Sequence, residues 1–521
     1  MLCGAAGKLF KFGGRQQAVE RCTPLKSSFN LVTFLLYVRI IHDQIFSDMK
    51  RLIIIASLFL SSYSLFAQQQ QLQMLIKQYG IPGIQLVCIK GNKEENFNLG
   101  TISTSSDKKV TSTTIFEAAS LSKCVFAYTV LRLYDKAIIN LDTPLLHYIG
   151  SYNRFNPADP RYAKITARIV LCHRTGLPNW GDSILPLLFE PDSIYSYSGE
   201  GFQFLQHVVE KITGKSLNEL AQQEVFTPLG MTNSSYTWID RFDTVAAFGN
   251  NPDIVSDYKT QRAASSLLSC AHDYAIFLRA LMTGKGLKPD TYKMMLEHQS
   301  AGNWFNHRSA EDMKYLSRAN KNIWWGLGIG LQENETGRWA WQWGDNGDFK
   351  GFCIVNQKTK EALVYFTYSK WGLHITSDVL NDFFPNQTWW PPVWIGYEFY
   401  EKKNMLAFWS QLDKQGYDDA MGIAQSLKQK NAAFLLPESD VNDLAFILLG
   451  RKMNKEATDI FKYNISVHPN SSGAYESLAE GYESIGEKKL AVENYKKAID
   501  LNPNDGYSAG RIKELESETN Q

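Results

Sequence analysis

The segment Phe116–Tyr128 reads FEAASLSKCVFAY and places Ser120 three residues before Lys123, at the start of an apolar run. Residues i and i+3 lie on the same face of a helix, so the hydroxyl and the amine should be neighbours. The apolar residues from Val125 to Leu133 predict that this helix is buried. The pair can therefore be interpreted in two ways, as catalytic or as structural.

In the catalytic interpretation, burial and the positive end of the helix dipole disfavour a charged Lys123 and lower its pKa. The neutral amine can then take the proton of Ser120, and backbone N–H groups at the helix start can stabilise an oxyanion. In the structural interpretation, Ser120 caps the helix and Lys123 extends its amine to solvent. Other Ser-x-x-Lys pairs, such as Ser106 and Lys109, lie in polar sequence, where a lysine keeps its ordinary pKa.

Composition restricts the classes of function. The chain has 521 residues, which predicts two or three domains. Its net charge is +1 and it has no basic stripe, so we expect no nucleic-acid partner. The seven cysteines occur singly, without a Cys-x-x-Cys pair. This spacing predicts neither a metal site nor a dense disulfide framework, and no sequence fingerprint predicts a cofactor.

The N-terminal region contains a targeting signal in an unusual place. Residues 49–67 have a basic start, an apolar core and a small residue, Ala67, before a run of glutamines. These three parts are typical of a secretory signal peptide. We therefore expect residues 1–48 to be a mis-annotated extension of the gene. The apolar segment is too short for a stable membrane span, which predicts a secreted or periplasmic protein.

The C-terminal region has a repeat. Residues 386–400 interrupt the periodicity of the preceding sequence and predict a linker that is packed through its tryptophans. Residues 401–521 read as helical, and small and aromatic residues recur with a 34-residue period at 438–471 and 472–505. This period is typical of tetratricopeptide repeats. Such a stack could bind a protein or peptide partner, or it could brace the preceding domain.

Four more motifs follow Ser120 in order: Ile165–Pro178, Tyr195–Phe202, Ala263–Tyr274 and Trp341–Phe349. With the Ser-x-x-Lys pair, they resemble the β-lactamase-related serine hydrolases, a superfamily of class C β-lactamases, D,D-peptidases and carboxylesterases. The resemblance covers residues 72–385. It implies an α/β (α+β) fold, in which an antiparallel sheet is flanked by helices and the active site lies between the sheet and an all-α lobe. The tetratricopeptide solenoid would follow this domain.

The resemblance also implies roles for individual residues. Ser120 would be the acylated nucleophile, Lys123 its partner, and Tyr197 a general base or proton relay. A phenol can act as a base only if nearby cations lower its pKa well below about 10. The strand Gln342, Trp343, Gly344 and Asp345 would flank the substrate, and the backbone N–H groups of Ser120 and Asp345 would form the oxyanion hole.

Two departures from the family pattern affect recognition of the substrate. Gly199, next to Ser198, stands where the family has an asparagine that binds the acyl group. Gln342 stands where the family has a lysine or histidine, so a substrate carboxylate should bind less well. We therefore favour a serine hydrolase of an ester or amide. A penicillin-recognising enzyme that acts on cell-wall substrates and a catalytically inactive scaffold that binds through its repeats are the alternatives.

Overall fold

The computed structural model describes residues 65–103, 106–247, 258–302, 319–397, 402–432, 434–503 and 505–519, together with residues 35, 39 and 42. All but three residues of the predicted extension 1–48 and most of the predicted signal peptide, 49–67, lie outside the described residues. Among the described residues, no helix is both long enough and apolar enough to cross a bilayer.

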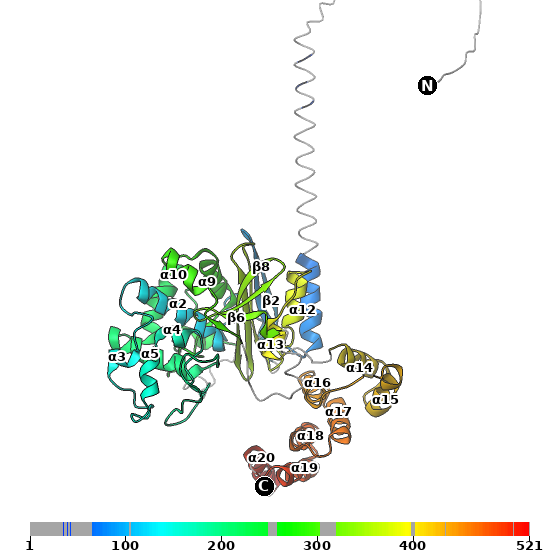
Figure 1. Ribbon diagram of the computed structural model, residues 1–521. Helices are drawn as coiled ribbons and strands as arrows, with labels where there is room; N and C mark the ends of the chain where they lie inside the picture. The colour runs from blue at the N-terminus through cyan, green and yellow to red at the C-terminus, as the bar shows by residue number, and fades with distance from the viewer. Residues whose placement is uncertain are drawn as a thin grey trace, which may run out of the picture. The chain divides into compact units, whose positions relative to one another are not determined.

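An eight-stranded antiparallel sheet forms the centre of the region that precedes the predicted linker (Figure 1). Alternate residues of its middle strands enter two different cores. Val364 and Phe366 pack into one core with helix α2, whereas Leu363 and Tyr365 pack into the other. In order across the sheet, the strands are β2 (Lys93–Gly100), β1 (Gly83–Lys90), β10 (Glu361–Tyr368), β9 (Phe349–Asn356), β8 (Gly337–Asn346), β7 (Gly330–Asn334), β6 (Ile323–Trp325) and β5 (Ser300–Ala301).

Helices cover both faces of the sheet, as the resemblance implied. One face packs against α9 (Ala271–Thr283) and α2 (Ser122–Asp135). The opposite face packs against α12 (Thr376–Phe383) and the helical residues 65–78. The all-α lobe beyond α2 contains α3 (Leu145–Ile149), α4 (Ala167–Leu171), α5 (Gly199–Thr213), α6 (Leu217–Ala221), α7 (Thr227–Leu229) and α10 (Pro289–Met295). The predicted fold class is therefore confirmed.

The C-terminal residues are helical. Helix α13 (Pro391–Ile395) lies in the segment predicted to be a linker, and Trp389 and Trp394 of this segment are buried. The helices that follow are α14 (Lys402–Gln415), α15 (Ala420–Lys430), α16 (Glu438–Gly450), α17 (Asn454–Val467), α18 (Ser472–Ser484), α19 (Lys488–Leu501) and α20 (Gly506–Thr519). Helices α16, α18 and α20 begin 34 residues apart each time, which matches the period of the sequence repeat. Their assignment as tetratricopeptide repeats stays a prediction.

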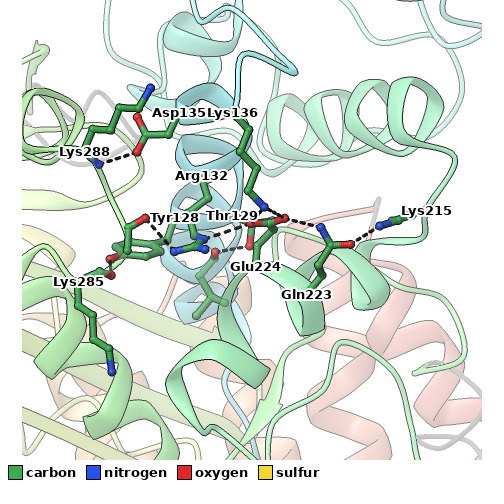
Figure 2. A network of polar contacts seen from close by, with 12 residues as sticks. Tyr128, Thr129, Arg132, Asp135, Lys136, Lys215, Gln223, Glu224, Lys285 and Lys288 are labelled. Atoms are coloured by element: carbon green, nitrogen blue, oxygen red, sulfur yellow. Dashed lines mark hydrogen bonds and ion pairs between the residues drawn. The ribbon is translucent and has the colours of Figure 1, made fainter.

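The end of α2 remote from Ser120 is fixed by a buried carboxylate (Figure 2). Glu224 accepts hydrogen bonds from Lys136 Nζ at 2.5 and 2.7 Å and from Arg132 Nε at 3.2 Å. Burial alone would raise the pKa of Glu224, but hydrogen bonds from Lys136, Arg132 and Gln223 bring it below its usual range. The carboxylate is therefore charged near neutral pH and binds α2 to the helical lobe.

We expect Glu224→Ala to lower the free energy of unfolding by about 2–4 kcal/mol, because it leaves two cations without the buried carboxylate they share. Glu190→Ala is a matched control, since it removes an exposed partner of Lys164. This control should change the free energy by less than about 1 kcal/mol. Urea denaturation of both variants measures the difference, and equal losses would show that Glu224 contributes no more than a surface charge.

Candidate active site

Ser120 lies in a tight turn between strand β3 (Phe116–Glu117) and α2. The turn is the short 3-10 helix η1 (Ala119–Leu121). Ala119 has a φ of +46°, in the left-handed region that non-glycine residues seldom adopt. The N-cap of α2 is Leu121, and no side chain caps this helix. Ser120 is therefore not the helix cap that the structural interpretation requires.

Lys123 lies inside the protein, with a side chain only 1% exposed. Its Nζ is 3.0 Å from Ser120 Oγ and donates to the carbonyl oxygen of Ala264 at 2.9 Å. Burial lowers the pKa of Lys123 to about 7. A large fraction of the amine is thus neutral near pH 7, which is the state that can accept the serine proton. The lysine does not extend to solvent.

The carbonyl that orients Lys123 is itself held by α5. Gln206 Oε1 accepts a hydrogen bond from the backbone N–H of Ala263 at 2.7 Å, and Gln203 Oε1 accepts one from Ala264 at 3.4 Å. Two consecutive residues of this loop are therefore tied to one helix. The motif Ala263–Tyr274 was recognised in the sequence, but these individual contacts were not foreseen, because they join segments about 60 residues apart.

Tyr197 completes the group of Ser120 and Lys123. Its hydroxyl oxygen accepts a hydrogen bond from Gln342 Nε2 at 3.1 Å, and its ring centroid lies 4.7 Å from Lys123 Nζ. Burial raises the pKa of Tyr197, although hydrogen bonds to the Ser120 and Gln342 side chains act in the opposite direction. The lowered pKa that a phenol needs in order to act as a base is therefore not present at Tyr197. Lys123 Nζ lies over the ring, and burial is the largest influence on the phenol pKa.

The pKa shifts of Lys123 and Tyr197 give the two groups different protonation states near neutral pH. The amine of Lys123 loses its proton near neutral pH, whereas the phenol of Tyr197 keeps its proton. Groups whose environments push their pKa values apart can act as base and acid in one reaction. In this arrangement Lys123 has the protonation behaviour that a base requires, whereas Tyr197 is a neutral phenol that can donate a hydrogen bond.

Gln342 is also fully buried, on strand β8. Its Nε2 donates to the Tyr197 hydroxyl and, at 3.2 Å, to the backbone oxygen of Ser120. Both amide protons are therefore used inside the protein. The sequence suggested that Gln342 offers a neutral donor to the substrate. In the structure it joins two residues of the site instead.

The neighbours of Gln342 on β8 have different surroundings. A Cβ atom on Gly344 would lie 2.5 Å from the carbonyl oxygen of Ala118, so only glycine lets β8 approach η1 this closely. Trp343 is buried against the Tyr197 ring, with centroids 4.8 Å apart. The Asp345 carboxylate pairs with Lys350 and accepts a hydrogen bond from Tyr397. The oxyanion hole of Ser120 and Asp345 N–H groups stays a prediction.

Ser198 and Gly199 form the start of α5. Ser198 caps this helix, because its Oγ accepts from the N–H of Gly201 at 2.9 Å. Its backbone N–H donates to His173 Nδ1 at 3.1 Å. His173 was not predicted as a site residue. The His173 ring stacks on the Tyr197 ring, with centroids 4.3 Å apart. Burial holds the pKa of His173 well below its usual value, so an uncharged imidazole packs against the Tyr197 ring.

Comparison with known proteins agrees with this geometry. A family model described as Beta-lactamase matches residues 64–371. Penicillin-binding protein 4 of Amycolatopsis lactamdurans is 25% identical over 184 residues, which cover 32% of this chain and 48% of that protein. Unguisins hydrolase ungD of Aspergillus violaceofuscus is 25% identical over 256 residues, covering 41% and 44%. N-acetylmuramyl-L-alanine amidase of Bacillus subtilis is 22% identical over 289 residues, covering 45% and 64%.

The chain spans about half the length of the first curated relatives it matches. Among solved structures, SurE with D-Leu aligns with a TM-score of 0.50 at 19% identity, over 62% of this chain and 75% of SurE, and this similarity supports the fold alone. The family match covers more than half of the chain and includes Ser120, Lys123, Tyr197 and Gln342. The chain belongs to the Beta-lactamase family.

Proposed function

We propose that the protein is an exported serine hydrolase that cleaves an ester or amide through an acyl-enzyme on Ser120. The observation that carries this proposal is the 3.0 Å approach of Lys123 Nζ to Ser120 Oγ, with the lysine pKa lowered to about 7. A buried, neutral amine beside a serine is what activates a weak hydroxyl as a nucleophile at neutral pH.

The reaction has two steps. In the first, Ser120 Oγ bonds to the carbonyl carbon while its proton passes to Lys123 Nζ. The tetrahedral intermediate then expels the alcohol or amine, which receives a proton from the ammonium of Lys123, with the Tyr197 hydroxyl as relay. In the second, water attacks the ester of Ser120 with Lys123 again as base, and the serine regains its proton when the acid leaves.

A penicillin-recognising enzyme is the second candidate, because several relatives are named as penicillin-binding proteins or D-alanyl-D-alanine carboxypeptidases. Two features weigh against it. The amide protons of Gln342 are used by Tyr197 and Ser120, and Gly199 offers no side-chain amide to an acyl group. A neutral ester needs neither contact, whereas the carboxylate of a β-lactam is normally bound by a charged donor.

The C-terminal helices are proposed to brace the hydrolase region. The ring of Phe446 on α16 stacks against Trp371, with centroids 6.3 Å apart. His374 Nε2 lies 3.5 Å from the Asp443 carboxylate of the same helix. Residues of α16 and α17 also share an apolar core with the sheet face that carries α12. These contacts favour the bracing role over a peptide-binding role for this part of the repeats.

A fluorophosphonate probe and two chromogenic substrates test the proposed function. We expect the probe to label one peptide, at Ser120, and a nitrophenyl ester to be hydrolysed at a higher kcat/KM than a chromogenic cephalosporin. A higher value for the cephalosporin would favour the penicillin-recognising candidate. Absence of labelling in folded protein would favour the catalytically inactive scaffold.

A further inference from the structure

Trp180 lies beside the reacting groups, on the loop that joins α4 to α5. Its ring centroid is 5.9 Å from Lys123 Nζ, the atom that contacts Ser120 Oγ. Yet the side chain is 51% exposed to solvent. Large aromatic side chains are mostly buried in folded proteins, so an indole that borders a candidate nucleophile and remains half exposed is a surface available to a ligand.

The backbone on both sides of Trp180 is held in place. Asn179 accepts hydrogen bonds from the N–H of Gly199 through its side-chain oxygen at 2.9 Å and through its carbonyl at 3.0 Å. On the other side, Glu200 Oε1 accepts from the N–H of Gly181 at 3.0 Å. Arg154 Nη1 donates to the same carboxylate at 2.6 Å. The loop therefore presents the indole from a fixed position, which reduces the entropy lost on binding.

Gly199 makes room for the ring. A Cβ atom at this position would lie 2.8 and 2.9 Å from two carbons of the Trp180 six-membered ring. Any larger residue would collide with the indole, including the asparagine that the family pattern places there. The chain thus has an aromatic surface beside Ser120 in place of a side-chain amide. The absence of a side-chain amide at Gly199 and the position of the Trp180 ring are thus sterically linked.

We propose that Trp180 forms an apolar binding subsite for the acyl part of the substrate, and that the preferred acyl group is neutral and carries an aromatic ring, as phenylacetyl does. This inference rests on the proposed hydrolase function. An aromatic group next to the scissile carbonyl would stack on the indole and remove its exposed face from water. A short acyl group such as acetyl has no aromatic ring that could stack on the indole.

The test compares nitrophenyl phenylacetate with nitrophenyl acetate in the wild type, Trp180→Ala and Trp180→Phe. We expect Trp180→Ala to raise KM for the phenylacetate about tenfold or more and to change KM for the acetate less than about threefold. Trp180→Phe keeps an aromatic face and should retain most of the selectivity. Gly199→Asn provides a second variant, because it displaces the indole from the other side and should also lower the preference for phenylacetate.

Two results would overturn the inference, and they are distinguishable. If Trp180→Ala lowers kcat/KM equally for both esters and moves the acidic limb of the pH profile upward, the indole only shields Lys123 from water. The subsite would then be wrong while the hydrolase remained. If the wild type hydrolyses neither ester and the fluorophosphonate does not label Ser120, the proposed function itself fails, and the subsite fails with it.

Discussion

Ser120→Ala is expected to lower kcat/KM for a nitrophenyl ester by about 10⁴-fold or more, because no other group can form the covalent acyl-enzyme. Ser120 does not cap α2, and its side chain contacts Lys123 and Tyr197 within the site. Loss of the hydroxyl should therefore leave the fold nearly unchanged. Steady-state kinetics measures the first effect, and urea denaturation measures the second.

Two variants make this prediction specific. Ser106 also lies three residues before a lysine, but Lys109 is exposed in the structure. Ser106→Ala therefore keeps the wild-type rate if burial of the lysine is what matters. Ser120→Cys retains a nucleophile at the same position and should react with iodoacetamide at that residue. Ester hydrolysis that survives Ser120→Ala at the wild-type rate would falsify the assignment of the nucleophile.

Much of the fold could be predicted because its signals are local. The short apolar runs at residues 84–90 and 363–368 are typical of buried strands, and the structure contains them as β1 and β10. The apolar run after Lys123 predicted the buried helix α2. Burial of Lys123, and thus its lowered pKa, followed from the same run. In each case the residues that determine the structure are adjacent in the chain.

The features that the sequence could not supply are contacts between distant segments. The sequence left open whether the pKa of Tyr197 is lowered, because the surroundings of the phenol depend on β8 and α5 together. The engagement of both Gln342 amide protons depends on η1, about 220 residues earlier in the chain. Trp180 was missed because it follows the motif Ile165–Pro178 by two residues and has no periodic signal. Its steric relation to Gly199 is visible only in the folded structure.

The second large effect is expected for Lys123→Met. The variant should lower kcat/KM by about 10³–10⁴-fold, because it removes the general base but keeps the nucleophile. In the wild type, the base must be neutral in order to accept the serine proton. Since the pKa of Lys123 is about 7, kcat/KM should rise about tenfold per pH unit below pH 7 and level off above it.

Although Lys123→Met should lower activity, it should raise the stability of the fold near neutral pH. The amine has a pKa near 7 in the folded protein and the ordinary lysine value of 10.5 when unfolded. Between these two values the unfolded chain binds more protons, so the contribution of Lys123 to stability rises with pH. At pH 7 the buried amine is therefore destabilising, and Lys123→Met should raise the free energy of unfolding by about 1–3 kcal/mol.

The excess free energy of unfolding of Lys123→Met over the wild type should then decrease by about 1 kcal/mol for each pH unit between pH 7 and 10. Lys285→Met is a suitable control, because Lys285 is exposed and its replacement should change stability by less than about 0.5 kcal/mol at every pH. Urea denaturation of the three proteins at pH 7, 8.5 and 10 measures the trend. A constant difference between wild type and Lys123→Met would mean that the amine titrates as an ordinary lysine, and Lys123 could not then serve as the neutral base that activates Ser120.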